Sequence, residues 1–420
     1  MATTNWAGNI AYAAKELVTP ETVADAQAAV RAATKVRALG SRHCFNAIAD
    51  TPGTQISLAK LNRVVAIDKQ ALRVKVEGGI RYGELGPQLH EAGYALHNLA
   101  SLPHISIAGA SATATHGSGM ALGSLATAVV ALEFINAAGD IVSLSREKDG
   151  DTFAGAVVNL GALGVVTGMT LAIEPTFDVR QDIFRELPFA EATAHFDEIM
   201  GAGYSVSLFT DWQGDTVEQV WIKRKVVAGE AQDLGPAFHG ATAASVNMHP
   251  VAALDAVNCT DQMGVAGPSY DRLPHFRMGF TPASGDELQV EYFVPAANAV
   301  AAMRTLARHG ERMAPLLIIS EVRTIAADDF WMSPFYREPC VAFHFSFKQN
   351  WAALERLLPG IEQALAPLKP RPHWGKLFTM PPSTIQARYP KLVPFRELLA
   401  AHDPLGKFRN AFVERYVFGK

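Results

Sequence analysis

Hydrophobic and polar residues alternate in short runs up to Pro175. Val74 and Val76 alternate with charged residues, which predicts a strand with one buried and one solvated face. A helix is expected to begin at Thr19 and Pro20, because a hydroxyl can cap free N–H groups and proline suits the first turn. It should end near Lys35. Other runs predict a helix over 82–92, strands over 35–39, 55–58, 64–68, 129–136 and 140–145, and a buried segment over 160–168.

Beyond Pro175 the alternating runs become longer. They predict strands over 204–212, 218–227, 287–294, 316–324 and 340–347, and helices over 297–309 and 351–365. This succession is typical of an antiparallel sheet with helices on one face, so the fold class is α+β. The segment 226–268 is rich in Ala, Gly and Pro and predicts no element. The turn-rich segment 403–412 is expected to return to the first part of the chain.

Length and charge set the number of domains and the kind of partner. The 420 residues exceed the usual size of one hydrophobic core, which favours two domains. We expect a first domain over 1–175, a second over 176–395 and a returning segment over 396–420. The 37 Lys and Arg residues are balanced by 41 acidic residues, which argues against nucleic acid as a partner. The expected partner is a neutral small molecule.

The cysteines and the N-terminus predict a cytoplasmic protein. Cys44, Cys259 and Cys340 are odd in number and widely spaced, which favours free thiols in a reducing compartment. The sequence begins without a basic segment followed by an apolar stretch. No apolar run reaches the length of about 18 residues that a membrane span requires. We expect a monomer without a membrane partner.

Two stretches of small residues could bring backbone amides close to a ligand. Nearly every residue from Ser106 to Gly119 is small, and the segment 40–43 directly follows a predicted strand. Consecutive N–H groups in such segments can hold a phosphate without a charged side chain. On composition alone, a tightly packed turn is the more common explanation of each stretch.

Several common site motifs are missing from the sequence. It has no G-x-G-x-x-G fingerprint after the first strand, no P-loop and no H-E-x-x-H motif. His90, His97, His104 and His116 do not have ligand spacing on one face. We therefore expect neither a nicotinamide site of the Rossmann type nor a metal site.

Polar residues share one face of each of two late strands. The two-residue period places Glu321 with Arg323, and His344 with Ser346, opposite an apolar stripe. For Glu321 and Arg323 alone, a solvated sheet face is the more common explanation. His344 and Ser346 beside large apolar residues, and Lys376 next to a tryptophan on a turn, favour a half-buried pocket for a hydroxylated substrate.

Ordered matches along almost the whole chain resemble one family. The matching segments are Asn-Trp-Ala-Gly-Asn (5–9), Gly-Ser-Arg-His-Cys-Phe-Asn (40–46), Ala-Ser-Leu-Pro-His-Ile-Ser (100–106), Thr-His-Gly-Ser-Gly (115–119), Gly-Ala-Leu-Gly-Val-Val-Thr (161–167), Ser-Leu-Phe-Thr-Asp-Trp (207–212), Leu-Pro-His-Phe-Arg (273–277), Glu-Val-Arg-Thr (321–324), Pro-His-Trp-Gly-Lys (372–376) and Asn-Ala-Phe (410–412). In these segments the chain closely resembles the alditol oxidases, FAD proteins of the vanillyl-alcohol-oxidase type. It is less similar to the sugar-lactone oxidases.

The resemblance implies that residues 1–175 form an FAD-binding domain and that the second domain carries the substrate. It also implies that His43 bonds covalently to the 8α-methyl group of the flavin, which should raise the flavin potential. The residues implied to line FAD are Ala38, Leu39, Gly40, Ser41, Arg42, His43, Cys44, Ser101, Ser106, Gly109, Thr113, Ala114, Thr115, His116 and Val166.

The implied reaction is hydride transfer from the terminal carbon of a polyol, such as xylitol or sorbitol, to flavin N5. Dioxygen then reoxidises the flavin and yields hydrogen peroxide. Arg323 and Lys376 are assigned to the reacting hydroxyl, and Glu321 to a neighbouring hydroxyl and to the arginine. His344 is either a proton acceptor or a donor. Ser101 and Ser346 hold the remaining hydroxyls.

The chain departs from the family pattern at two positions. Cys44 stands where serine is expected, and little loss of function should follow. Ser346 stands where threonine is expected; the missing methyl group should shift the polyol preference by about 1 kcal/mol or less. The resemblance implies that the small residue Ala100 governs oxygen access to the flavin. The nearest alternative is an aldonolactone oxidase or dehydrogenase, and a remote one is a non-enzymatic sugar-binding protein on a flavin scaffold.

Overall fold

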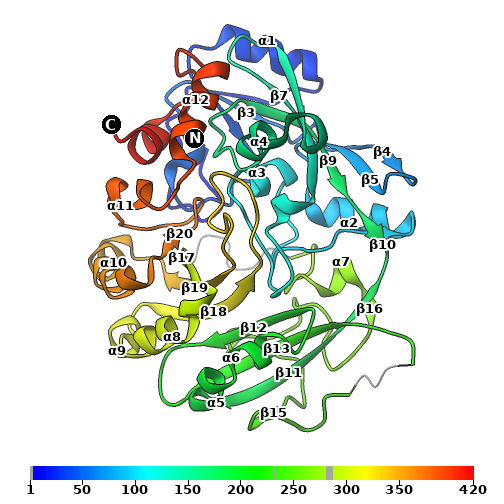
Figure 1. The fold of residues 1–420 in the computed structure, drawn as a ribbon, viewed down its shortest axis with the longest axis vertical. Coiled ribbons are helices and arrows are strands. Elements are labelled where there is room, and N and C mark those ends of the chain that lie inside the picture. The colour runs from blue at the N-terminus through cyan, green and yellow to red at the C-terminus, as the bar shows by residue number, and fades with distance from the viewer. Residues whose placement is uncertain (1–2, 230–232, 281–286) are drawn as a thin grey trace.

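The computed structural model describes residues 3–229, 233–280 and 287–420. Figure 1 shows the first domain, blue to cyan, together with the red C-terminal segment, on one side of the second domain, green to yellow. Among the described residues, no helix combines the length and apolarity needed to cross a membrane.

Two sheets form most of the first domain. The smaller sheet is parallel and has the order β1 (Glu16–Val18), β3 (Thr54–Ser57), β2 (Val36–Leu39). The larger sheet is antiparallel, in the order β4 (Val64–Asp68), β5 (Arg73–Glu77), β9 (Val165–Ala172), β7 (Val129–Ile135), β8 (Ile141–Ser145). The short strands β6 (Tyr94–Ala95) and β10 (Glu174–Pro175) pair with each other.

The helices of the first domain correct three predictions. Helix α1 (Val23–Ala32) begins after Thr22, not Thr19, because Thr22 and Asp25 form a reciprocal capping box. The helix also ends before Lys35. The small-residue stretch contains a short helix, α3 (Ile107–Ala112), instead of a continuous loop. Helix α2 (Tyr82–Glu91) confirms its prediction, whereas α4 (Arg146–Val157) was not predicted.

A ten-stranded antiparallel sheet forms the second domain. Its order is β14 (Ala237–Phe238), β15 (Ala241–Ala243), β11 (Asp178–Pro188), β13 (Thr216–Lys225), β12 (Ser205–Thr210), β18 (Leu317–Ile325), β19 (Cys340–Lys348), β17 (Glu287–Pro295), β20 (Arg371–Pro372), with β16 (Gly267–Pro268) beside β11. The five predicted strands are present, which confirms the α+β fold class. The long strand β11 was missed, and three short strands lie within 226–268, where no element was expected.

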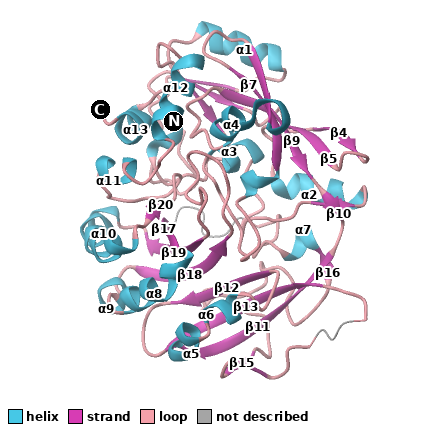
Figure 2. Cartoon of the chain, viewed as in Figure 1, coloured by secondary structure: helices cyan, strands magenta, loops and turns pink. Residues whose placement is uncertain are grey.

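Helices cover the second domain at both ends of the sheet. Figure 2 shows α8 (Ala299–Ala307), α9 (Gly310–Met313) and α10 (Trp351–Leu365) gathered beside β17 and β19, whose apolar residues share a core with them. The remaining helices are α5 (Phe189–Ala194), α6 (Phe196–Met200), α7 (Ser269–Arg272), α11 (Pro382–Gln386), α12 (Leu392–His402) and α13 (Ala411–Val413). Short helical turns lie at Ala47–Ala49, Leu125–Ala128, Ala296–Asn298, Ala366–Leu368 and Glu414–Phe418.

The C-terminal segment packs on the first domain. The Val36 N–H donates to the Lys407 carbonyl over 3.0 Å, and Phe408 is buried in a small core with Val30 and Ile56. The predicted boundary at residue 396 falls inside α12. This boundary and the one near residue 175 stay predictions.

Candidate functional site

A cavity of about 570 Å³ is lined by both domains. The loops after β2 and after β6 contribute residues on one side, and strands β17, β18 and β19 contribute residues on the other. Most residues singled out from the sequence line it: Ala38, Leu39, Gly40, Ser41, Arg42, His43, Cys44, Ser101, Gly109, Thr113, Thr115, His116, Glu321, Arg323, His344, Ser346 and Lys376. Folding therefore brings the two predicted groups of residues to one place.

A second cavity, of about 320 Å³, shares residues 38–41 and Gly109 with the first. It is lined mainly by small residues and contains the predicted Ser106 and Val166. A Cβ atom built on Gly40 would lie 2.7 Å from Ser106 Oγ, so the two loops approach closely because no side chain separates them. Of the predicted site residues, only Ala114 lines neither of these two cavities; it is fully buried.

The His43 loop is held by the N-terminal segment. The Asn5 amide donates to the Cys44 carbonyl over 2.9 Å, and the Asn9 amide donates to the Phe45 carbonyl over 2.8 Å. The indole of Trp6 stacks on the His43 imidazole with 5.3 Å between ring centroids. These contacts place the segment 5–9, one of the segments that resemble the family, directly against the His43 loop.

The His43 imidazole is buried and neutral. Both of its ring nitrogens are out of solvent, and neither has a partner in hydrogen-bond geometry among the described residues. Burial lowers the pKa of His43 to about 4, and the Ser41 backbone acts in the opposite direction. A neutral ring nitrogen has a free lone pair, so the side chain fits a covalent bond to a cofactor.

Strand register confirms the predicted polar face. Glu321 on β18 pairs with His344 on β19, and Arg323 and Ser346 follow at two-residue steps on the same sides of their strands. All four side chains line the larger cavity, and Glu321 and Arg323 are buried. The solvated sheet face is therefore ruled out for them.

Glu291 on β17 is the main functional candidate that was missed. One carboxylate oxygen lies 2.8 Å from an Arg323 terminal nitrogen and 3.3 Å from His116 Nε2. The other lies 2.8 Å from Lys376 Nζ. Glu291 is 1% exposed. The two-residue period of 287–294 places Gln289 and Glu291 on one face, so the same argument applied to this strand would have found it.

Ion pairs keep both buried carboxylates charged. Burial raises the pKa of Glu291, but Lys376, His116 and Arg323 outweigh it and hold the pKa well below its ordinary value. For Glu321, burial is likewise outweighed, chiefly by Arg323 and His275, and the pKa is lowered. Burial lowers the pKa of Lys376, and Glu291 opposes this effect. The floor of the cavity thus holds two carboxylates against two cations.

Other polar groups of the floor remain available to a ligand. His344 Nε2 is buried and has no hydrogen-bond partner among the described residues. Burial and the nearby Lys376 lower the pKa of His344 to about 3, so its ring is neutral near pH 7. Ser101 Oγ accepts from Arg323 over 3.2 Å, and Ala100 lies beside it in the cavity wall. This combination of donors and acceptors suits hydroxyl groups.

One cluster with metal-ligand residues lies elsewhere among the described residues. Ligand atoms of Glu191, His195 and His239 lie within 4.8 Å of one another. None of the three lines the larger cavity. A metal there would have no direct part in the chemistry of that cavity.

Comparison with known proteins adds evidence that is independent of the geometry. Residues 14–145 match the model of an FAD binding domain, and residues 286–416 match that of D-arabinono-1,4-lactone oxidase. An alditol oxidase from Streptomyces sp. is 46% identical over 422 residues, covering 100% of this chain and 99% of that protein. An L-gulono-1,4-lactone dehydrogenase from Mycobacterium tuberculosis is 30% identical, with 98% of each chain covered.

Solved structures support the fold. A solvent-stable cholesterol oxidase superposes with a TM-score of 0.80 over 99% of this chain and 97% of its own, at 15% identity. At this low identity, the similarity shows a shared fold and no other shared property. Since the Streptomyces protein matches from end to end, the chain belongs to the alditol oxidase family of FAD-binding flavoproteins.

Proposed function

We propose that the protein is an FAD-dependent oxidase that converts the terminal primary hydroxyl of polyols such as xylitol and sorbitol to an aldehyde. The observation that carries this proposal is the charge-balanced floor of Glu321, Arg323, Glu291 and Lys376, which shares one cavity with His43. A chain of hydroxyls needs both donors and acceptors, and this floor offers both. The end-to-end similarity to an alditol oxidase supports the same substrate class.

The residues of the floor would act on the polyol in different ways. Arg323 and Lys376 stabilise the negative charge that develops on the reacting oxygen. Glu321 accepts a hydrogen bond from the neighbouring hydroxyl and orients Arg323, 3.4 Å away. Neutral His344 offers Nε2 to a further hydroxyl, as acceptor or donor. Ser101 and Ser346 hold the rest of the chain.

The small-residue cavities and His43 would hold the cofactor. The backbone amides around Gly40, Gly109 and Ser106 suit a pyrophosphate, and the neutral, unbonded nitrogens of His43 suit a covalent bond to the 8α-carbon of the flavin. Bound FAD supplies the hydride acceptor and, after reaction with dioxygen, releases hydrogen peroxide.

Steady-state assays with peroxide detection test the proposal. Xylitol and sorbitol should be turned over with peroxide release, and L-gulono-1,4-lactone should be a poor substrate. The match of 286–416 to a lactone oxidase model favours the lactone as the second candidate. Turnover of the lactone without turnover of either polyol would show that the protein acts on sugar lactones instead. A colourless protein without bound flavin would favour a non-enzymatic sugar-binding protein.

We also propose that the protein works as a monomer in the cytoplasm, with the polyol and dioxygen as its only partners and without nucleic acid. The near balance of acidic and basic residues supports this proposal. Light scattering coupled to size exclusion should give a mass near 45.2 kDa. A mass twice as large would overturn the monomer.

A further inference from the structure

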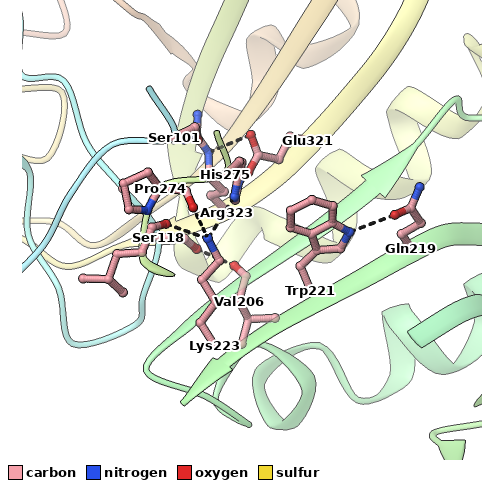
Figure 3. Close-up of polar contacts among 12 residues, drawn as sticks. Ser101, Ser118, Val206, Gln219, Trp221, Lys223, Pro274, His275, Glu321 and Arg323 are labelled. Carbon is pink, nitrogen blue, oxygen red and sulfur yellow. Dashed lines mark hydrogen bonds and ion pairs between the residues drawn. The ribbon is translucent and has the colours of Figure 1, made fainter. Parts of the chain in front are cut away.

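A line of three buried side chains runs from the cavity into the sheet: Glu321 and His275 line the larger cavity, and Lys223 lies behind them. Lys223 on β13 contacts His275, in the segment after α7, and His275 contacts Glu321 on β18 (Figure 3). Lys223 Nζ lies 3.0 Å from His275 Nδ1, and His275 Nε2 lies 2.8 Å from Glu321 Oε1. Lys223 is 1% exposed and does not line the larger cavity, so it acts on a ligand only through its neighbours.

Three acceptors surround the Lys223 amine. They are the Leu273 carbonyl at 2.6 Å, the Pro274 carbonyl at 3.1 Å and His275 Nδ1 at 3.0 Å. An ammonium group has three N–H donors, one for each acceptor. Burial lowers the pKa of Lys223 to about 7. The amine nevertheless faces two carbonyls and the unprotonated Nδ1 of His275, and only its charged form has one donor for each.

Only one assignment of donors and acceptors satisfies the hydrogen bonds among Lys223, His275 and Glu321. The Glu321 carboxylate is ionised and can only accept, so His275 Nε2 must carry a proton. Burial lowers the pKa of His275 to about 4, so the ring is neutral and its Nδ1 must accept from Lys223. The amine and the carboxylate thereby select a single tautomer of His275.

The His275 ring is also held by its packing. The indole of Trp221 lies edge-on at 5.1 Å between ring centroids, and the Phe209 ring lies at 5.6 Å. Trp221 is fixed in turn, because its indole N–H donates to Gln219 over 2.8 Å. A ring flip, which would put Cδ2 and Cε1 where the two nitrogens lie, is therefore hindered, and the position of the proton becomes the remaining variable.

We propose that Lys223 and His275 are positioning residues that fix the Glu321 carboxylate toward the substrate, with Lys223 holding the His275 ring through Nδ1. The proposal rests on the proposed function, since it takes Glu321 to contact a substrate hydroxyl. With Oε1 engaged by His275 and Oε2 3.4 Å from Arg323 Nε, the carboxylate cannot rotate without losing both partners. Removing a residue that orients a ligand-binding side chain typically lowers activity roughly 10- to 100-fold.

A simpler role for Lys223 is structural: its amine holds the segment 273–275 through the carbonyls of Leu273 and Pro274. Thr260 provides the matched control, because its hydroxyl donates to the same Pro274 carbonyl over 2.8 Å. Its backbone N–H donates to the His275 carbonyl over 3.0 Å, a bond that a substitution keeps. Thr260→Val removes an anchor of the segment and leaves the line of three side chains intact. Lys223→Met removes the anchor and the donor to His275 Nδ1 together.

The test combines kinetics with ¹⁵N NMR of the histidine rings in the FAD-loaded protein. Wild type and Thr260→Val should show His275 as the Nε2–H tautomer, assigned by loss of its signals in His275→Gln. Lys223→Met should show a His275 ring that takes up a second proton at a higher pH, because the Lys223 charge that opposes that proton is lost, and a roughly tenfold or larger fall in kcat/KM for xylitol, relative to Thr260→Val.

Two results would overturn the proposal. One is an Nδ1–H tautomer in wild type, which needs no variant and so decides the matter even if Lys223→Met fails to fold. The other is equal kcat/KM and equal protonation of His275 across the pH range in the Lys223→Met and Thr260→Val proteins. If wild type oxidises no polyol, the proposed function fails, whereas the NMR result still tells whether Lys223 acts on His275.

Discussion

Glu291 Oε2 lies 2.8 Å from Lys376 Nζ, although β17 and the turn after β20 are separated by more than one helix along the chain. Glu291 is buried and Lys376 is half-buried, and the same carboxylate also contacts Arg323. One acidic side chain thus compensates both cations that are proposed to act on the reacting hydroxyl. Its removal should alter the whole floor.

Glu291→Gln should lower kcat and stability together. The amide keeps the shape of the side chain but leaves two buried cations without their counter-ion, and breaking a buried pair costs about 3–5 kcal/mol. Xylitol turnover should fall roughly 100-fold, because the cations lose their fixed positions. Stopped-flow flavin reduction and urea unfolding measure the two effects. The control is Glu355→Gln on the exposed face of α10, and equal behaviour of the two variants would contradict the role of Glu291.

His43→Ala should convert a covalent flavin into a dissociable one. Removal of the imidazole removes the only proposed bond between protein and flavin carbon, while the amide-lined cavities stay. After acid precipitation the wild-type pellet should be yellow, and the variant should release its flavin into the supernatant. His90→Ala, which changes a histidine outside both cavities, should keep the yellow pellet. A colourless wild-type pellet with yellow supernatant would show that no covalent bond forms.

The alternation of polar and apolar residues along two strands was sufficient to predict one half of the cavity floor. The two-residue period placed Glu321 with Arg323 and His344 with Ser346, and strand register brings these pairs together. The same period was not applied to 287–294, and Glu291 was missed for that reason. The contact between Glu291 and the turn of Lys376 joins distant segments, which no local pattern reports.

Long-range contacts limited the rest of the prediction. The order β13, β12, β18 brings Lys223 near Glu321, and His275 reaches both from the segment after α7, so no local pattern joins the three residues. Strand β11 was missed because its polar residues face neighbours instead of solvent; Gln181, for example, is fully buried. Thr19 and Thr22 are equally good caps by composition, and only the Asp25 contact distinguishes them.

Acid should destabilise the protein through its buried histidines. Burial lowers the folded-state pKa of His344 to about 3 and that of His275 to about 4, against 6.5 when unfolded. Between these values the unfolded chain binds protons that the folded chain does not, so stability falls as pH falls from about 6.5 toward 4. Urea unfolding across this range measures the slope, which His344→Gln should reduce. A flat wild-type profile would contradict the buried neutral rings.

Glu218 should act in the opposite direction over part of the same range. Burial, and then the charge of Asp211, raise its pKa to about 7 from 4.5. The folded chain therefore binds the extra proton, and this residue adds stability as pH falls from about 7 to 4.5. Glu218→Gln should be more stable than wild type above pH 7 and should lose stability more steeply in acid. Because the side chain is only half-buried, we expect a gain of about 1 kcal/mol or less. Identical urea profiles for wild type and variant would show that the carboxyl is solvated.

Ser346→Thr should shift the preference among polyols without abolishing activity. The hydroxyl is kept, and the added methyl group fills part of the cavity, which changes discrimination between chain lengths by about 1 kcal/mol or less, or roughly fivefold. Ser346→Ala instead removes the hydroxyl and should raise KM for every polyol, since a substrate hydroxyl loses its partner. The kcat/KM ratios for xylitol and sorbitol in the two variants distinguish volume from hydrogen bonding. If both variants match wild type on both substrates, the polyol does not reach β19, and the orientation proposed for the substrate is wrong.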